Sequence, residues 1–183
     1  MMKEEFMRQL ALKNGFAAAA VIHAEEIYTV PEYREFCVQN LCGNYGKNYG
    51  CPPYCGTPEE MRKKILRYSR ALVLQTRNQV EDMYDGAETG RLKKAHTKKT
   101  LQLIRLLKEQ GMEGKGLAIM AGSCNLCESC KMPEGQPCPH EDMSFSCLSA
   151  YCIDAGHLAK SCGMDMSWTG NIVSFFSIYL FDE

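Results

Sequence analysis

The sequence predicts an α/β domain with a small, mostly parallel sheet, covering helices and cysteine-rich metal-binding loops at the strand ends. Two apolar, strand-like runs at 71–76 and 116–122 are joined through a long amphipathic helix at 91–110. Strands connected in this way usually lie parallel in one sheet. The cysteine-rich segment 124–138 directly follows one of these strands, and the other cysteine-rich segment, 37–55, is interrupted by Gly, Asn and Pro. Such interruptions exclude a regular helix or a central strand.

In the N-terminal half, the apolar spacing of residues 3–14 predicts a short helix, and Gly15 is placed to end it. The run FAAAAVI at 16–22 predicts a buried strand. The sequence TPEE at the start of segment 57–68 combines a Thr N-cap, a Pro at the first helical position and a Glu at the third. A second helix therefore begins there.

In the C-terminal half, the polar stretch QVEDMYDGAETG is predicted to be a linker before the helix at 91–110, which Gly111 ends. The run at 116–122 is the next strand. The segment 143–162 predicts a helix, although Gly156 weakens that helix by about 1 kcal/mol. The final segment, 171–181, is rich in β-branched and aromatic residues and predicts the last strand.

Composition limits the class of protein. A chain of 183 residues that is 45% hydrophobic is long enough to bury a core, so we expect one domain over 1–183. The net charge of −1 gives no reason to expect nucleic acid or an anionic membrane as a partner. No apolar run reaches about 18 residues, so no membrane span is expected. The N-terminus is a poor signal peptide, which favours a cytoplasmic protein.

Eleven cysteines are the dominant chemical feature. In a short secreted chain they would indicate disulfides, but this chain is not short, its cysteine count is odd and it lacks an export signal. Eight of them form two groups of four, which read better as metal sites than as disulfides. The predicted metal ligands are Cys37, Cys42, Cys51 and Cys55 in the first group and Cys124, Cys127, Cys130 and Cys138 in the second.

The second group has the spacing Cys-x2-Cys-x2-Cys-x7-Cys-Pro. Three cysteines this close together wrap a loop around a cubane, and bacterial ferredoxins place a proline after the fourth cysteine. A structural zinc site more often takes two pairs of cysteines from separated segments. The spacing therefore favours a 4Fe–4S cluster over zinc at the second group.

The first group has the less diagnostic spacing Cys-x4-Cys-x8-Cys-x3-Cys. Glycines and asparagines between these cysteines allow the backbone conformations that a metal-wrapping loop needs. Bound thiolates would fix a loop that has no regular structure of its own. Spacing alone leaves iron–sulfur and zinc equally open here, so the expected cofactors are one or two 4Fe–4S clusters, with zinc as the alternative.

The combination CVQNLCGNYGKNYGCPPY, a strand-like ALVLQT and CNLCESCKMPEGQPC resembles the prokaryotic family called domain of unknown function 2284. The resemblance covers most of the chain from about Cys37 onward and implies metal binding, without implying a reaction. It matches the first three cysteines of the first group and all four of the second. If Cys55 is not a ligand, the first site is either open or completed by another residue.

Three cysteines remain outside the groups. Cys147, Cys152 and Cys162 lie on or near the predicted helix at 143–162, where cysteine packs as a small hydrophobic residue. His140 could replace a thiolate and His157 could approach the second group, but we expect both to be unliganded.

Basic residues crowd the long predicted helix, as Arg91, Lys93, Lys94, Lys98, Lys99, Arg105 and Lys108. Such residues usually form a solvated face. The alternative is a docking surface for an acidic electron carrier.

The leading functional hypothesis is an iron–sulfur protein that exchanges single electrons with a redox partner protein in a reducing cytoplasm. The second hypothesis is an enzyme in which a cluster reduces a substrate or cofactor held at the strand ends. The third is a zinc-stabilised interaction module without a redox role. The sequence does not determine the oligomeric state.

Overall fold

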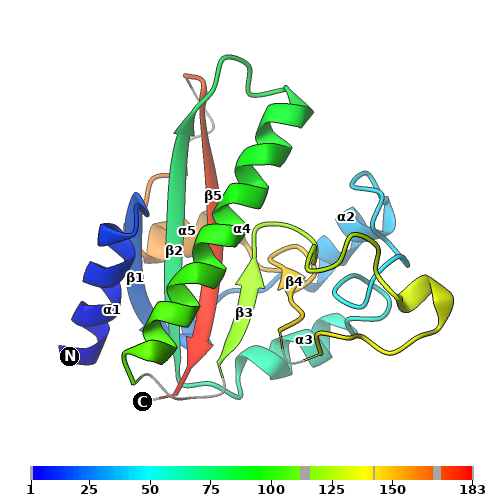
Figure 1. Ribbon diagram of the computed structural model, residues 1–183, viewed down its shortest axis with the longest axis horizontal. Helices are drawn as coiled ribbons and strands as arrows, with labels where there is room; N and C mark the ends of the chain where they lie inside the picture. Colours follow the sequence, from blue (N-terminus) through cyan, green and yellow to red (C-terminus); the bar gives the residue numbers. More distant parts are fainter. Residues whose placement is uncertain (1, 112–115, 142, 167–169, 183) are drawn as a thin grey trace.

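The computed structural model describes residues 2–111, 116–141, 143–166 and 170–182 (Figure 1). Helices and strands are interspersed along the described residues, with three short 3-10 turns among them. The α-helices are α1 (Met2–Lys13), α2 (Arg34–Val38), α3 (Pro58–Ile65), α4 (Gly86–Glu109) and α5 (Ala155–Ser161). The strands are β1 (Ala18–His23), β2 (Arg70–Gln79), β3 (Leu117–Met120), β4 (Ser146–Cys147) and β5 (Ile172–Phe181).

The five strands form one mixed sheet in the order β1-β2-β5-β3-β4. Three of the neighbouring pairs are antiparallel, and only β3 with β4 is parallel. The fold is therefore α/β, but the prediction of a mostly parallel sheet is wrong. The strands at 71–76 and 116–122 do run in the same direction, because both β2 and β3 pair antiparallel with β5, yet β5 lies between them.

The central place of β5 has a physical reason. Nine of its ten residues are buried, so both of its faces and both of its edges need partners. β2 pairs with one edge of β5 along its whole length, and β3 pairs with the C-terminal end of the other edge. The local sequence shows that such a strand is buried, but it does not show which strands pair with it. The predicted direct pairing of β2 with β3 is wrong for that reason.

Helices cover both faces of the sheet (Figure 1). Side chains of β2 alternate between the faces: Leu72 and Leu74 pack with α1 and α4, whereas Ala71 and Val73 pack with α3 and α5. The period of two along a strand produces this division. The molecule is thus a three-layer α/β/α arrangement with an apolar cluster on each side of the sheet.

Several local predictions are confirmed. Helix α1 ends before Gly15, which has φ of +81°, and α3 begins with the predicted capping box. In that box the Thr57 hydroxyl accepts from the Glu60 amide at 3.2 Å, and the Glu60 carboxylate accepts from the Thr57 amide at 2.7 Å. Helix α4 begins earlier than predicted, because the Asp85 side chain caps it, so the end of the predicted linker is helical.

The predicted helix at 143–162 is wrong. The segment begins with β4, continues through turns and becomes helical only in α5. Cys152 has φ of +55°, and Asp154 caps α5 by accepting from the His157 amide at 2.8 Å. The apolar pattern of residues 143–162 looks like that of one continuous helix. The pairing of β4 with β3 and the N-cap at Asp154 divide this segment into a strand, turns and a short helix.

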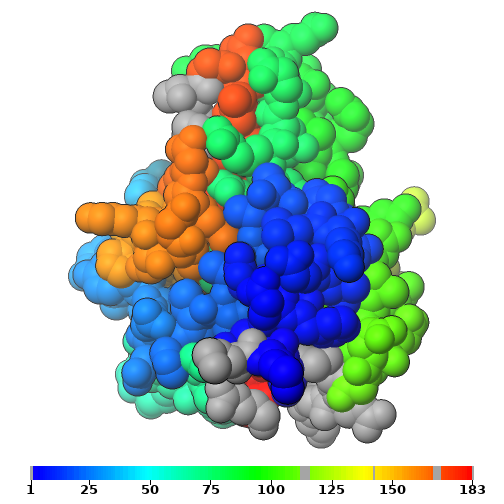
Figure 2. Space-filling view, turned by 90° about the vertical axis from the view of Figure 1, so that its left-hand side faces the viewer, coloured from blue at the N-terminus to red at the C-terminus, as the bar shows by residue number. Residues whose placement is uncertain are grey.

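The two edges of the sheet differ in what they carry. The edge at β4 faces both cysteine-rich segments, which lie together on the right in Figure 1. Figure 2 shows the opposite side, which α1 (dark blue) and the segment around α5 (orange) cover. Among the described residues, no helix is long and apolar enough to cross a membrane.

The buried His96 of α4 predicts a pH dependence of stability. Burial, followed by the charge of Lys99, lowers the pKa of His96 from 6.5 to about 4. Between these values the unfolded chain binds a proton that the folded chain does not, so stability falls as pH falls from about 6.5 to 4, by about 3 kcal/mol for this group. His96→Gln should flatten this slope in urea unfolding.

The exposed His23 provides the control for that experiment. His23→Gln should keep the wild-type slope when all proteins are compared in the same state of metal loading. An unchanged slope in His96→Gln would show that His96 is not the group responsible.

Candidate functional site

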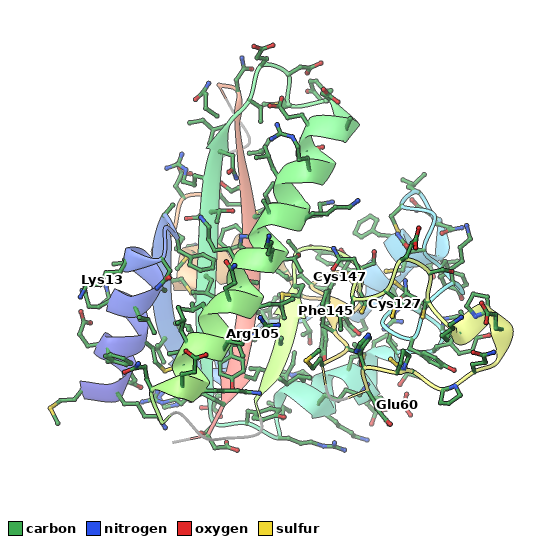
Figure 3. The ribbon with its side chains drawn as sticks, viewed as in Figure 1. Lys13, Glu60, Arg105, Cys127, Phe145 and Cys147 are labelled. Atoms are coloured by element: carbon green, nitrogen blue, oxygen red, sulfur yellow. The ribbon has the colours of Figure 1, made fainter. Side chains whose placement is uncertain are left out.

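The two cysteine-rich segments lie against each other beyond β4 (Figures 1 and 3). The Tyr49 hydroxyl in the first segment donates to the Gln136 carbonyl in the second at 2.7 Å. Asn48, Tyr49 and Gly50 also form part of the wall around the second group of cysteines. Segments separated by about seventy residues in the sequence thus form one continuous region.

The second group lies on the loop that leaves β3 and returns to β4. Met120 ends β3, and the chain then forms bends and one 3-10 turn at Met132–Glu134. A cavity of about 30 Å³ lies within this loop. All four predicted thiols line it, namely Cys124, Cys127, Cys130 and Cys138.

The neighbouring thiols act electrostatically on Cys127. Burial raises the pKa of Cys127, and Cys124, Cys138 and Cys130 raise it further, while Lys131 acts in the opposite direction. A bound cation would stabilise thiolates gathered in this way. The loop is therefore suited to a thiophilic metal or cluster.

The first group lies on α2 and the turns that follow it. Cys37 is near the end of α2, and the described residues 39–56 contain neither helix nor strand. Gly43 and Gly46 have φ of +71° and +68°, conformations that fold the chain back on itself. The Gly46 amide donates to the Pro52 carbonyl at 2.8 Å and closes this loop.

A larger cavity of about 720 Å³ lies beside the first group. Three of the four predicted thiols line it, together with two cations of α4 and one cysteine from β4. These residues are Cys37, Cys42, Cys51, Lys93, Lys94 and Cys147. The first group thus has its own cavity, adjoining that of the second group through the residues just before Cys51.

Two thiols of the first group, Cys51 and Cys37, have strongly raised pKa values. Burial raises the pKa of Cys51 to about 12, with Cys147 as the next cause, and an Asn48 hydrogen bond acts against the rise. Burial raises the pKa of Cys37 to about 11, again with Cys147 as the next cause. These thiols are neutral in the absence of metal, so metal binding must displace their protons.

Cys55 lies elsewhere. It is 5% exposed and packs in the apolar cluster with Met61 and Ile65 of α3. The Arg34 guanidinium lies 3.7 Å from its sulfur, and Lys64 donates to its carbonyl at 2.7 Å. Cys55 does not line either of the two cavities. Its role as a metal ligand therefore stays a prediction.

Cys147 is one of the three cysteines that the sequence analysis assigned to packing, and the structure places it in the lining of the first cavity. Figure 3 shows it beside Phe145, between the sheet and the cysteine-rich segments. Cys152 follows it at the same Cys-x4-Cys spacing that separates Cys37 from Cys42, but these two cysteines stand outside the two groups of four. The structure places Cys147, and not Cys152, in the lining of the first cavity.

The other singled-out residues lie apart from the first cavity. Cys152 is buried, and Cys162 packs against the apolar cluster that contains α3 and α5, in agreement with their predicted packing role. His157 is exposed and its ring contacts that of Tyr28 at 5.0 Å. His140, in contrast, lines the cavity of the second group.

All eleven cysteines are free thiols. Among the described residues, no three His, Cys, Asp or Glu side chains converge closely enough to hold a single metal ion. Near the first group the Nε atom of Arg34 is buried without a hydrogen-bond partner among the described residues. The cysteines that line the two cavities are of the type that binds thiophilic metals or clusters.

Comparison with protein families gives one match. A family model described as "Predicted metal-binding protein (DUF2284)" matches residues 20–181, which include all the cysteines. Comparison with curated proteins and with solved structures found no match.

Gly50 tests how the first segment is held against β4. A Cβ atom at this position would lie 2.2 Å from the Phe145 carbonyl oxygen, far inside contact distance. Gly50→Ala should therefore push the loop away from β4 and lower the free energy of unfolding by about 1–3 kcal/mol, measured with denaturant.

Gly90→Ala is the matched control for this substitution. Gly90 lies in α4, and no described atom is within 4 Å of its added Cβ. That change should be neutral or stabilising by up to about 1 kcal/mol, because alanine favours a helix over glycine. Wild-type stability of Gly50→Ala would contradict the close packing of the loop on β4.

Proposed function

This chain belongs to the DUF2284 family of predicted metal-binding proteins, and from that premise we propose that it binds one or two 4Fe–4S clusters and transfers electrons. The observation that carries the proposal is the pair of adjoining cavities, each lined by its own set of thiols. Adjacent clusters are suited to passing single electrons through a protein. Such a protein belongs in a reducing compartment, and we propose the cytoplasm.

The arrangement of the thiols favours a cluster over zinc. One zinc ion gathers its thiolates tightly, with each sulfur about 2.3 Å from the metal. Thiolates that bind different irons of a cubane are held apart by the body of the cluster. Four thiols that line one cavity, as those of the second group do, support the second case.

Positive charge around the first group supports the same assignment. Arg34 counteracts part of the rise in the pKa of Cys37, and Lys93 and Lys94 line the cavity from α4. A cluster held by four thiolates carries net negative charge, which is costly to bury unless cations lie near it. These three residues would supply that compensation.

When bound, a 4Fe–4S cluster supplies one-electron chemistry, and the protein tunes its potential. The chain's own residues would contribute the thiolates and limit the access of water. Tyr49 forms part of the wall between the two segments, and the cysteines of the second group are only half-buried. Cys42 of the first group is exposed, so electrons would have access at either cysteine-rich segment.

The cavity of about 720 Å³ favours a second candidate function. This volume lies in the range of small-molecule sites, and the cavity combines cysteines with Lys93 and Lys94. A redox enzyme that reduces an anionic substrate next to a cluster would use such a cavity. A zinc-stabilised interaction module remains the third alternative, and it would contain no acid-labile sulfide.

Metal and sulfide analysis tests the proposed function. Protein prepared without oxygen should be brown and contain about four or eight iron atoms with equal sulfide, for one or two clusters. Cys127→Ser should lower both by about four, because serine is a poor ligand for iron in such clusters. Cys162→Ser, at a half-buried cysteine outside both cavities, is the control and should retain all the iron. Stoichiometric zinc without sulfide would refute the cluster.

A redox partner is also part of the proposal, and α4 offers a cationic approach to the first cavity. Lys94→Glu should slow oxidation of the reduced protein by the anionic tris(oxalato)cobaltate several-fold at low salt and speed oxidation by cationic hexaamminecobalt(III). Stopped-flow absorbance measures both rates. Lys13→Glu, on α1 at the far edge (Figure 3), should change neither rate. Equal effects of the two substitutions would exclude a local role for α4.

A further inference from the structure

The cavity of the first group is lined by four cysteines, but they are not the four that are closest in the sequence. Cys147 joins Cys37, Cys42 and Cys51 there, and Cys55 does not. The lining of this cavity thus selects Cys147, and not Cys55, as the fourth cysteine of the first site.

Backbone pairing fixes the position of Cys147. Cys147 pairs with Met120 in the parallel β3–β4 ladder, and the following amide, of Leu148, donates to the Met120 carbonyl at 3.0 Å. Two residues before Cys147, the Phe145 carbonyl lies directly against the backbone at Gly50, the residue that precedes Cys51. The β4 strand and the loop of the first cysteine group are therefore in contact next to Cys147 and Cys51.

The surroundings of the Cys147 sulfur combine burial with backbone donors. Burial raises the pKa of Cys147, and hydrogen bonds from the backbone amides of Ala150 and Ser149, in the turn after β4, act against that rise. Amide-to-sulfur hydrogen bonds of this kind are a standard means of stabilising cluster thiolates and tuning the cluster. A cysteine that served only as an apolar filler would have no need of two such donors.

Cys55 has different surroundings. Its sulfur is directed to the Arg34 guanidinium at 3.7 Å, and its side chain packs against α3 in the apolar cluster. Arg34 in turn donates to the Ala150 carbonyl at 2.9 Å, so it spans from Cys55 to the turn that follows Cys147. Cys55 thus helps to support the wall of the site without facing its cavity.

We propose that Cys147 is the fourth thiolate of the first site, together with Cys37, Cys42 and Cys51, and that Cys55 is not a ligand. The inference rests on the proposed function, since it takes a 4Fe–4S cluster as the occupant. It makes the first site a complete four-thiolate site whose last ligand follows the second cysteine group in the chain. Two-cluster ferredoxins similarly take a cysteine from beside one cluster to ligate the other.

Iron analysis in a single-site background tests the ligand set. With Cys127→Ser removing the second cluster, adding Cys147→Ser should reduce the first site from about four irons to three or none, seen by iron content and electron paramagnetic resonance. Adding Cys55→Ser should leave about four. A four-iron cluster that survives Cys147→Ser, or that is lost specifically on Cys55→Ser, would overturn the proposal.

Alkylation of the wild-type protein gives a second readout that does not depend on the folding of a variant. Cys147 is half-buried, so iodoacetamide should label it after chelation and not after reconstitution with iron and sulfide. Cys162, also half-buried, is the control and should be labelled equally in both states. Equal labelling of Cys147 in both states would overturn the proposal.

The same labelling experiment with zinc alone separates this inference from the proposed function. If the protein contains zinc and no sulfide but Cys147 is protected, the iron–sulfur proposal fails and the ligand assignment stands. If sulfide and iron are present but Cys147 is labelled, the ligand assignment fails and the iron–sulfur proposal stands.

Discussion

The short parallel pairing of β3 with β4 positions everything that distinguishes this protein. Only Ile119 with Ser146 and Met120 with Cys147 pair in this ladder. Because the two strands are parallel, the chain must leave the end of β3 and travel back to the start of β4, and the second cysteine group occupies that excursion. The same ladder presents Phe145 to Gly50 and so anchors the first group.

The rest of the molecule is an α/β core that holds the β4 edge of the sheet in place. Apolar clusters on the two faces of the sheet involve four helices and the long strands β2 and β5. These clusters need no metal to bury their side chains. The cysteine-rich loops, in contrast, have little regular structure, so bound thiolates would supply the order that backbone pairing does not.

Polar residues connect the support to the loops at a few defined points. Arg34 bridges Cys55 and Ala150, and the Tyr49 hydroxyl contacts the Gln136 carbonyl. The contact of Arg34, the first residue of α2, with Ala150 and the contact of Tyr49 with Gln136 join segments far apart in the sequence. The geometry of the candidate site therefore depends on tertiary contacts that are few in number and specific in position.

The sequence alone determined the features that rest on local chemistry. The capping box of Thr57 and Glu60, the helix end at Gly15, the buried β2 and β5 runs and the two cysteine groups are all encoded within short windows, where caps, periodicity and spacing act directly. The four thiols of the second group line one cavity, as their close spacing in the sequence suggested. The single domain over the whole chain and the identity of the bound metal stay predictions.

Tertiary structure alone decided which distant segments meet. Insertion of β5 between β2 and β3 follows from the need to pair both edges of a fully buried strand, which no local pattern expresses. The apolar pattern at 143–162 looked helical until pairing with β3 drew residues 146–147 into the sheet. That pairing also carries Cys147 to the first cavity while α3 retains Cys55 in the apolar cluster. The spacing of cysteines along the chain cannot show that Cys147 rather than Cys55 lines the first cavity, because the position of Cys147 depends on where β3 and β4 lie in space.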